Sequence, residues 1–276
     1  MRTTLQRIIA QGADAAEARA LALMLLEEVA GLTTADVLMG RADSLDDSLR
    51  QRLIAMAQRI GEGEPIQYVL GYADFCGLRI GVAPGVLIPR PETEELVQWV
   101  CSDLNALATP RLLDIGTGSG CIALALKHLN PFSTVCAWDV SDDALRQARA
   151  NAAALSLEIH TRKADIFDLP DTTERYDAIV SNPPYILRSE AADMEERVTC
   201  HEPHLALFVP DDDPLCCYRA IGAWAQQHLK PGASLYFEIN RAQADTTVAL
   251  LRHQGYTRVD LRTDQFGNPR MIRAQL

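Results

Sequence analysis

From residue 111 onwards, short apolar runs that predict strands alternate with amphipathic stretches that predict helices. The predicted strands cover residues 111–115, 134–140, 158–165, 176–181, 234–239, 257–263 and 271–276, and the predicted helices cover 121–129, 141–155, 214–229 and 242–254. Such alternation is typical of a mostly parallel sheet with helices on both faces. Only residues 264–269 separate the last two strands, so we expect an antiparallel hairpin there. The sequence therefore predicts an α/β fold with a mostly parallel seven-stranded sheet.

A glycine-rich loop, Gly116-Thr117-Gly118-Ser119-Gly120, lies between the first predicted strand and the helix that follows it. Glycines at this point allow a tight turn and let a ligand approach the backbone closely. The spacing is G-x-G-x-G, which differs from the G-x-G-x-x-G of dinucleotide-binding proteins. The loop alone is weak evidence, but an acid at the end of the next strand strengthens it. We expect all five residues to contribute to a cofactor site.

That acid is Asp139. A carboxylate at the tip of the second strand can accept hydrogen bonds from both hydroxyls of a ribose. The alternative is that Asp139 caps the helix that begins near Ser141, and we favour ribose binding. Asp165 ends the third predicted strand, where it can accept a hydrogen bond from an adenine amino group while Ile166 packs on the base. The residues favour neither this role of Asp165 nor a purely structural one.

The strand at 176–181 is followed by Asn182-Pro183-Pro184-Tyr185. The two prolines end the strand because neither can donate to a sheet ladder. Asn182 is pushed toward an extended backbone and presents an amide with both an acceptor and a donor. Pro183 adds a carbonyl and Tyr185 a flat face. Taken alone, the four residues fit either a strand-ending turn or a pocket for a small planar polar group.

Together these features predict an adenosine-bearing cofactor across the strand tips, with Asn182 touching it and Asn182 to Tyr185 facing it. The combination resembles the class I (Rossmann-like) methyltransferases that use S-adenosylmethionine. Within that class, N-P-P-Y marks methylation of a nitrogen on a planar group. The acceptor is then either an amide or the exocyclic amine of a base.

Residues 1–60 read as helical, without any catalytic constellation. We expect a helix capped by Asp14 and stopped by Gly31, another that starts at Thr33 or Thr34, and a further one that starts at Ser44. Such a small helical domain without chemistry of its own is suited to recognition or cover. We expect this helical region to be the first domain of the chain.

Residues 78–82 and 86–88 alternate around Pro84-Gly85 and predict a β-hairpin. A helix opens at Pro91 and runs through Val100, with acids in its first turn. The predicted domains are therefore a helical bundle for substrate recognition at 1–73, a β-hairpin linker at 74–90 and the methyltransferase domain at 91–276.

The formal net charge is −11 and the isoelectric point about 5.0. This argues against a protein that binds mainly nucleic-acid backbones, which requires a basic surface. The seven cysteines have irregular spacing, and no C-x-x-C pair is present. We therefore expect reduced thiols and a cytoplasmic location. The cysteines and histidines between Cys200 and Cys217 fit no common zinc pattern, and neither a membrane segment nor a signal peptide is recognisable, so no metal and no membrane are predicted.

The wider chain resembles the PrmC/HemK family of peptide chain release factor glutamine methyltransferases, over nearly its full length. The motifs that carry this resemblance are residues 63–68, 87–94, 114–120 and 182–185, Glu202-Pro203, Ala206-Leu207, Asp264, Gly267 and Arg270. One departure is Asn240, which stands where we expect glycine or another small residue, and no role is assigned to it.

The resemblance implies that S-adenosylmethionine is the methyl donor. The acceptor is the glutamine in the Gly-Gly-Gln loop of class 1 release factors, which are the implied protein partners. The product is N5-methylglutamine. Asn182, Pro183 and Tyr185 are the implied catalytic residues, and Pro184 and Leu87 join them in binding the substrate.

The chemistry of the residues agrees with this assignment. An amide nitrogen is a poor nucleophile because its lone pair is delocalised into the carbonyl. The Asn182 oxygen and the Pro183 carbonyl can each accept one N–H of the substrate amide, which aligns its nitrogen with the methyl group. Tyr185 is expected to pack on the amide plane.

Three alternatives remain. A ribosomal protein glutamine methyltransferase would share N-P-P-Y but resembles this chain less at residues 90–94. An adenine-N6 nucleic-acid methyltransferase is opposed by the acidic isoelectric point. A non-catalytic module that senses the cofactor is opposed by the intact motif at 182–185.

Overall fold

The computed structural model describes residues 1–276 and divides into two units. One unit comprises Met1–Gly71 together with Glu195–His201. The other comprises Tyr72–Met194 together with Glu202–Leu276.

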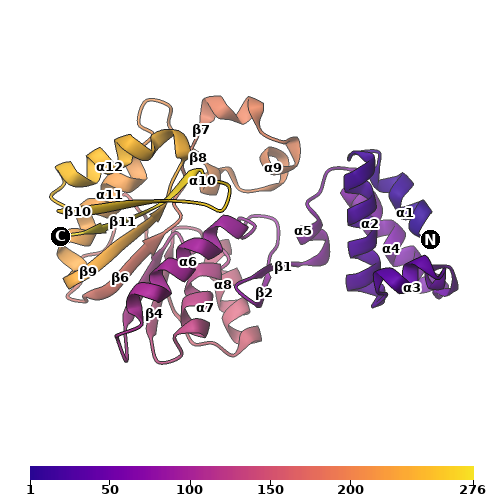
Figure 1. The fold of residues 1–276 in the computed structure, drawn as a ribbon, viewed down its shortest axis with the longest axis horizontal. Helices are drawn as coiled ribbons and strands as arrows, with labels where there is room; N and C mark the ends of the chain where they lie inside the picture. The colour runs from indigo at the N-terminus through magenta and orange to yellow at the C-terminus, as the bar shows by residue number, and fades with distance from the viewer. The chain divides into compact units, whose positions relative to one another are not determined.

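The first unit is built from helices (Figure 1). They are α1 (Arg2–Ile9), α2 (Ala15–Ala30), α3 (Thr34–Leu38), α4 (Asp47–Gly61), α5 (Ile66–Leu70) and α9 (Glu196–His201), with a 3₁₀ turn η1 (Arg41–Ser44). Buried side chains such as Leu5, Leu25 and Leu53 join α1, α2 and α4 in one core. Arg197 on α9 forms an ion pair with Glu17 on α2.

Three of the predicted helix boundaries of this unit are confirmed. The Asp14 carboxylate accepts from the backbone N–H groups at the start of α2, and Gly31 ends that helix with a left-handed backbone, φ +65°. Thr33 caps α3. The predicted start at Ser44 is wrong, because its hydroxyl donates to the Arg41 carbonyl and Asp46 caps α4 instead.

The second unit is organised around a seven-stranded sheet with the order β10-β11-β9-β6-β3-β4-β5. Its strands are β3 (Arg111–Ile115), β4 (Thr134–Asp139), β5 (His160–Lys163), β6 (Tyr176–Ser181), β9 (Leu229–Glu238), β10 (Arg258–Thr263) and β11 (Pro269–Gln275). The strands from β9 to β5 are parallel, and β11 is antiparallel to both β9 and β10. The mostly parallel seven-stranded sheet and its C-terminal hairpin are therefore confirmed.

Helices cover both faces of this sheet (Figure 1). They are α6 (Pro91–Leu104), α7 (Cys121–Leu129), α8 (Asp142–Leu155), α11 (Cys216–His228) and α12 (Ala244–His253). The shorter elements are β7 (Ile186–Leu187), η2 (Arg188–Asp193), α10 (His204–Leu207), β8 (Phe208–Val209) and η3 (Arg241–Gln243).

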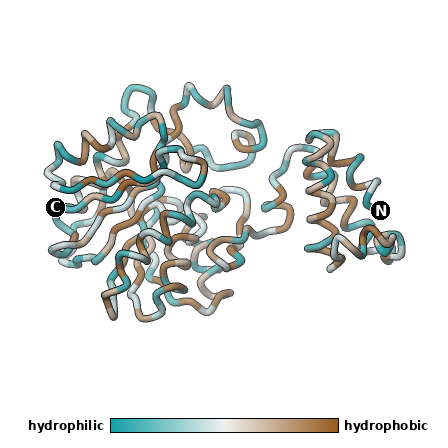
Figure 2. Tube along the Cα trace, in the orientation of Figure 1, coloured by the Kyte–Doolittle hydropathy of each residue, from teal (hydrophilic) through white to brown (hydrophobic).

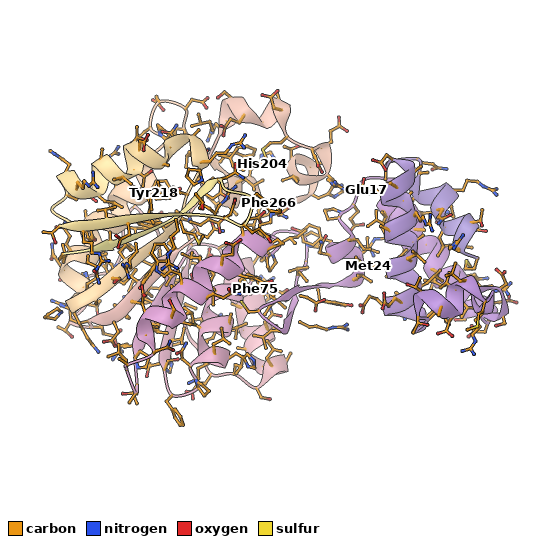
Figure 3. The ribbon with its side chains drawn as sticks, viewed as in Figure 1. Glu17, Met24, Phe75, His204, Tyr218 and Phe266 are labelled. Atoms are coloured by element: carbon orange, nitrogen blue, oxygen red, sulfur yellow. The ribbon has the colours of Figure 1, made fainter.

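Each face of the sheet has its own hydrophobic core, because side chains alternate along a strand. On β6, Ala178 and Val180 face the core under α6 and α7, whereas Ile179 faces the core under α11. Phe75 and Tyr218, labelled in Figure 3, belong to these two different cores. Figure 2 shows hydrophobic residues recurring along the helices and the inner strands. The inner strands β3, β4 and β6 are thus buried on both faces, whereas the edge strands β5 and β10 are largely exposed.

The hairpin near residue 80 is not the predicted one. It pairs β1 (Tyr72–Phe75) with β2 (Leu78–Gly81), and it turns at Cys76 and Gly77, which both have positive φ. The predicted turn at Pro84-Gly85 is present, since the Val86 N–H donates to the Ala83 carbonyl at 3.2 Å, but the hairpin predicted around it is wrong, because residues 86–88 form no strand. The Ile88 N–H donates to the Glu202 carboxylate at 3.1 Å instead of joining a ladder.

The register of the parallel strands brings several segments to one edge of the sheet. Ile115 pairs with both Trp138 and Ser181, and Ser181 pairs with Phe237. The residues that follow these positions therefore emerge together at the carboxyl ends of β3, β4, β6 and β9. None of the helices has both the length and the apolar character needed to cross a membrane.

The Gly120 position tests the packing of α7 on α8. A Cβ there would lie 3.0 Å from the Ala148 Cβ, whereas a Cβ at Gly118 would meet nothing within 4 Å. Both glycines have positive φ. We expect Gly118→Ala to cost about 1 kcal/mol of unfolding free energy through backbone strain. Gly120→Ala adds a clash of about 1–3 kcal/mol. Urea denaturation measures both, and equal losses in the two variants would contradict the tight packing.

Candidate active site

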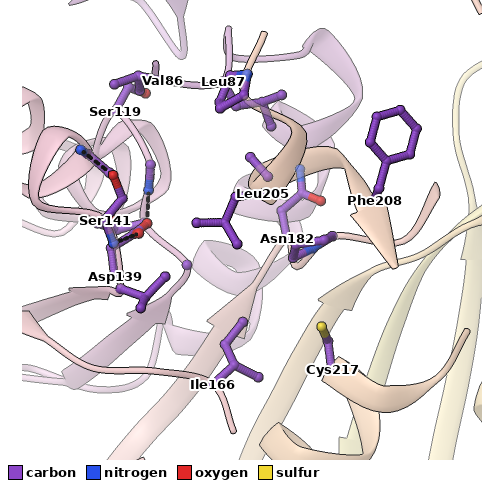
Figure 4. A pocket seen from close by; sticks show the side chains of 18 of the residues that line it. Val86, Leu87, Ser119, Asp139, Ser141, Ile166, Asn182, Leu205, Phe208 and Cys217 are labelled. Atoms are coloured by element: carbon purple, nitrogen blue, oxygen red, sulfur yellow. Dashed lines mark hydrogen bonds between the residues drawn. The ribbon is translucent and has the colours of Figure 1, made fainter. Parts of the chain in front are cut away.

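A cavity of about 360 Å³ opens at the carboxyl ends of the parallel strands (Figure 4). Its volume lies in the range of roughly 300–1,000 Å³ that is typical of small-molecule sites. The predicted site residues that line it are Leu87, Gly116, Thr117, Gly118, Ser119, Asp139, Asp165, Ile166, Asn182 and Pro184. Gly120, Pro183 and Tyr185 are not among the lining residues.

The glycine-rich loop is tied to the tip of β4 by backbone hydrogen bonds. The Gly116 and Thr117 N–H groups donate to the Trp138 carbonyl at 2.8 and 3.0 Å. The Gly118 N–H donates to Asp139 Oδ2 at 2.9 Å. A Cβ built on Gly116 or Gly118 would meet no other atom within 4 Å. The loop is therefore held in shape while its open side leaves room for a ligand to approach the backbone.

Asp139 holds together the two loops that follow β3 and β4. Besides the bond from Gly118, its Oδ1 accepts from the Ser141 N–H at 2.8 Å. The N-cap of α8 is Ser141, whose hydroxyl accepts from the Ala144 N–H, and Asp139 bonds to the backbone N–H of this cap residue. Burial raises the pKa of Asp139, and the hydrogen bonds from backbone N–H groups oppose this. Each carboxylate oxygen still has a lone pair for a ligand hydroxyl.

Asp165 and Ile166 lie beyond the end of β5, because that strand stops at Lys163 and not at the predicted residue 165. Asp165 Oδ1 accepts from the Phe167 N–H at 2.9 Å, which fixes the turn. Ile166 and the exposed Phe167 line the cavity beside it. The acid and the apolar side chains thus lie at the same part of the cavity wall.

Asn182 lies directly after β6, and its side chain reaches the cavity between Leu205 and Phe208 in Figure 4. Its Nδ2 donates to Thr93 Oγ1 at 3.3 Å. Thr93 in turn donates to Glu238 Oε2 at 2.6 Å. Sequence reasoning missed both Thr93 and Glu238. The available signal was Glu238 itself, a single acid inside the apolar run of β9.

Tyr185 lies behind the cavity. Its hydroxyl donates to Glu238 Oε1 at 3.0 Å, and its ring packs against the core under α11. Burial raises the pKa of Tyr185, and the nearby Glu238 charge adds to this. Pro183 is buried as well. Gly120 caps the start of α7.

A further wall of the cavity comes from the segment around Leu87, whose place at the site was predicted, and from the segment around Leu205. Val86 and Leu205 contribute apolar surface (Figure 4). The buried Glu202 holds the segment around Val86 by accepting from the Ile88 N–H and from Arg90 Nη2, the latter at 2.6 Å. This pairing places Leu87 beside the cavity and explains why residues 86–88 do not form a strand.

Asp114 is fully buried beneath the glycine-rich loop. Its Oδ2 accepts from the Thr117 hydroxyl at 2.6 Å and from the Ala123 N–H at 3.2 Å. Its Oδ1 has no hydrogen-bond partner. Burial raises the pKa of Asp114 to about 7, against the effect of these two hydrogen bonds. No group of three or more His, Cys, Asp or Glu side chains is arranged to hold a metal ion.

Comparison with known proteins identifies the family. The "PrmC N-terminal domain" family model matches residues 3–71, and the "Methyltransferase small domain" model matches residues 94–201. A curated "Release factor glutamine methyltransferase" from Bacteroides thetaiotaomicron is 43% identical over 259 residues, which cover 94% of this chain and 92% of the relative. A protein of the same name from Flavobacterium psychrophilum is 38% identical, covering 99% and 96% of the two chains.

The chain belongs to the release factor glutamine methyltransferase family. The resemblance to the PrmC/HemK family is thereby confirmed.

Solved structures support the fold of this family member. A ribosomal protein L11 methylase from Lactobacillus delbrueckii subsp. bulgaricus superimposes with a TM-score of 0.51, at 22% sequence identity. The alignment covers 71% of this chain and 84% of that one. At this identity the likeness concerns the fold alone. The predicted class I, Rossmann-like methyltransferase fold with an N-terminal helical region is confirmed.

The buried Asp114 predicts a pH-dependent stability in this family member. Because its folded-state pKa of about 7 is above the ordinary value, its contribution is fully present below pH 3.8 and is lost as pH rises toward 7. The loss amounts to at most about 4 kcal/mol. In Asp114→Asn, the amide oxygen can keep the two hydrogen bonds without a charge. We expect the unfolding midpoint of this variant to rise above wild type at pH 8 and to gain less than half as much at pH 5. A difference that does not change with pH contradicts the prediction.

Proposed function

We propose that this protein transfers a methyl group from S-adenosylmethionine to the side-chain amide nitrogen of the glutamine in the Gly-Gly-Gln motif of class 1 release factors. Family membership supports the acceptor, since the curated relatives are named release factor glutamine methyltransferases. The observation that carries the chemistry is the Asn182 amide. It lines the cavity, and one N–H of its NH2 group donates to Thr93 Oγ1.

The cavity suits the proposed cofactor. The open glycine-rich loop receives its amino acid part, and Asp139 accepts from the ribose hydroxyls. Asp165 accepts from the adenine amino group while Ile166 packs on the base. When bound, S-adenosylmethionine supplies a methyl group on a sulfonium. The residues of the chain bind and orient the two reactants.

The acceptor amide is placed by Asn182 and Pro183. The Asn182 Oδ1 and the Pro183 carbonyl each accept one N–H of the substrate NH2 group. Holding the nitrogen in line with the methyl group reduces the entropic part of the barrier. The same two oxygens stabilise the positive charge that the nitrogen gains during transfer. Leu87 and Pro184 provide the apolar surface beside it.

Tyr185 acts from behind the site. Because its hydroxyl is held by Glu238 and its ring lies in the core, we assign it the role of holding the turn that carries Asn182 and Pro183. No general base is required before attack, since the nitrogen can lose its proton after it has received the methyl group. This fits an acceptor site formed by an amide and a carbonyl.

We assign substrate recognition to the helical region at 1–73, a linking role to residues 74–90 and catalysis to 91–276. Release factors are the protein partners, and the reaction belongs to translation termination in the cytoplasm. The family model for residues 3–71 supports a distinct N-terminal domain.

One experiment tests the proposed function against its alternatives. The purified protein is incubated with methyl-labelled S-adenosylmethionine and, separately, with a class 1 release factor, with ribosomal proteins and with DNA or RNA. Mass spectrometry then locates the label. We expect it on the glutamine of the Gly-Gly-Gln motif. Label on adenine, or on a ribosomal glutamine in preference to the release factor, overturns the proposal.

Asn182→Ala should bind S-adenosylmethionine with little change in Kd but lose on the order of 100-fold in kcat. The reason is that the variant removes an acceptor that acts on the substrate nitrogen. Calorimetry gives the affinity and the label assay gives the turnover. Asn105→Ala, at an exposed asparagine after α6, is the matched control and should behave as wild type. Full turnover in Asn182→Ala would refute the assigned role.

A further inference from the structure

Three side chains form a continuous hydrogen-bonded chain at the wall of the cavity, which both Asn182 and Thr93 line. Glu238, at the end of β9, accepts from the Thr93 hydroxyl at 2.6 Å, and Thr93 accepts from Asn182 Nδ2 at 3.3 Å. Glu238 is 1% exposed and Thr93 2% exposed, so water does not compete for these bonds. Thr93 comes from the first turn of α6, far from both partners in sequence.

The order of donors and acceptors along this chain is set at Glu238. An ionised carboxylate only accepts hydrogen bonds, so both Thr93 and Tyr185 must donate their hydroxyl protons to it. Thr93 has a single hydroxyl proton. Toward Asn182 its oxygen can therefore only accept.

Asn182 must consequently turn its NH2 group toward Thr93. The two ends of an asparagine amide have nearly the same shape, so only its hydrogen-bond partners decide which end points where. With the NH2 end on Thr93, the Oδ1 end is available to the cavity that Asn182 lines. The carboxylate thus sets the orientation of an amide that it does not touch.

The surroundings of Glu238 include groups that raise its pKa and groups that lower it. Burial raises the pKa of Glu238, and the charge of Glu92 adds to this. The hydrogen bonds from Thr93 and Tyr185 and the positive charge of Arg270 lower it. Arg270 is itself paired with the buried Asp264 at 3.3 Å. Together these effects raise the pKa of Glu238, whose carboxylate has two hydrogen-bond donors and a nearby cation as partners.

We propose that Glu238 and Thr93 are positioning residues that orient the Asn182 amide, so that its oxygen faces the cavity and selects an acceptor group bearing an NH2. This rests on the function proposed above. A substrate NH2 donates to the oxygen. A carboxylate in the same place, as in a glutamate instead of a glutamine, offers only acceptors and meets the Asn182 oxygen unfavourably.

The test compares two substitutions of Thr93. Thr93→Val keeps the shape but removes the hydroxyl, whereas Thr93→Ser keeps the hydroxyl. We expect Thr93→Val to lower kcat on the release factor roughly tenfold to a hundredfold, with an unchanged Kd for S-adenosylmethionine. Thr93→Ser should restore most of the turnover. Loss of cofactor affinity in parallel with kcat, or no rescue by serine, overturns the inference.

A double-mutant cycle separates positioning from a general structural effect. If Thr93 acts through Asn182, then Thr93→Val should cause no further loss of kcat in an Asn182→Ala background. An equal fractional loss in both backgrounds contradicts the inference. Thr247→Val is the matched control. Thr247 lies on the other side of the sheet, is also buried, and donates its hydroxyl proton to the Gln243 backbone carbonyl. It should change stability without changing kcat.

The outcome for the wild type separates failure of the proposed function from failure of the positioning role. If the wild-type protein does not methylate the release factor glutamine, the proposed function fails. If it does, and Thr93→Val turns over as fast as wild type, only the positioning role fails. Thermal unfolding of each variant confirms that the folded protein is being measured.

Discussion

The alignment of the parallel strands is the constraint on which the rest of the structure depends. Strands that run in one direction place all their carboxyl ends at the same edge of a sheet. The pairing of Ile115 with Trp138 and with Ser181 sets this edge to within one residue. Segments that are far apart in the chain therefore meet there without any long loop reaching across. A shift of one residue in any of these pairings would move Asp139 or Asn182 to the wrong face.

The same edge concentrates polar groups that are costly to bury. Asp114, Thr93 and Glu238 are almost inaccessible, and each is held by specific hydrogen bonds. An unpaired polar group in such a place costs about 1–3 kcal/mol or more. Elsewhere in the sheet, apolar residues fill the same strand positions. The polar cluster thus reduces what the core contributes to stability, and in return it fixes the directions of the groups that face the cavity.

Much of this arrangement is predictable from local sequence. The strands at 111–115 and 176–181 and the helix at 121–129 match the prediction to the residue, because glycine or proline bounds each apolar run. The β-hairpin is not predictable in this way, because residues 86–88 show the same alternation as a strand although they form none. The turn of the observed hairpin places Cys76 at a positive φ, and a cysteine in the sequence does not indicate such a backbone conformation. Similarly, Ser44 and Asp46 are equally good caps, and the choice follows from the bond of Ser44 to Arg41. Thr93 and Glu238 lie 145 residues apart, so no local pattern reveals their pairing.

The two strands at the edges of the sheet bear on how a protein partner can be bound. Residues Arg162 and Lys163 on β5, and Arg258 and Arg262 on β10, put charged side chains along both borders. Charges on edge strands oppose pairing with a strand from another molecule. A partner loop is therefore not expected to extend this sheet by adding a strand to it. Recognition of a protein is left to side chains of the loops and helices, which can change in sequence without disturbing the backbone ladder of the sheet.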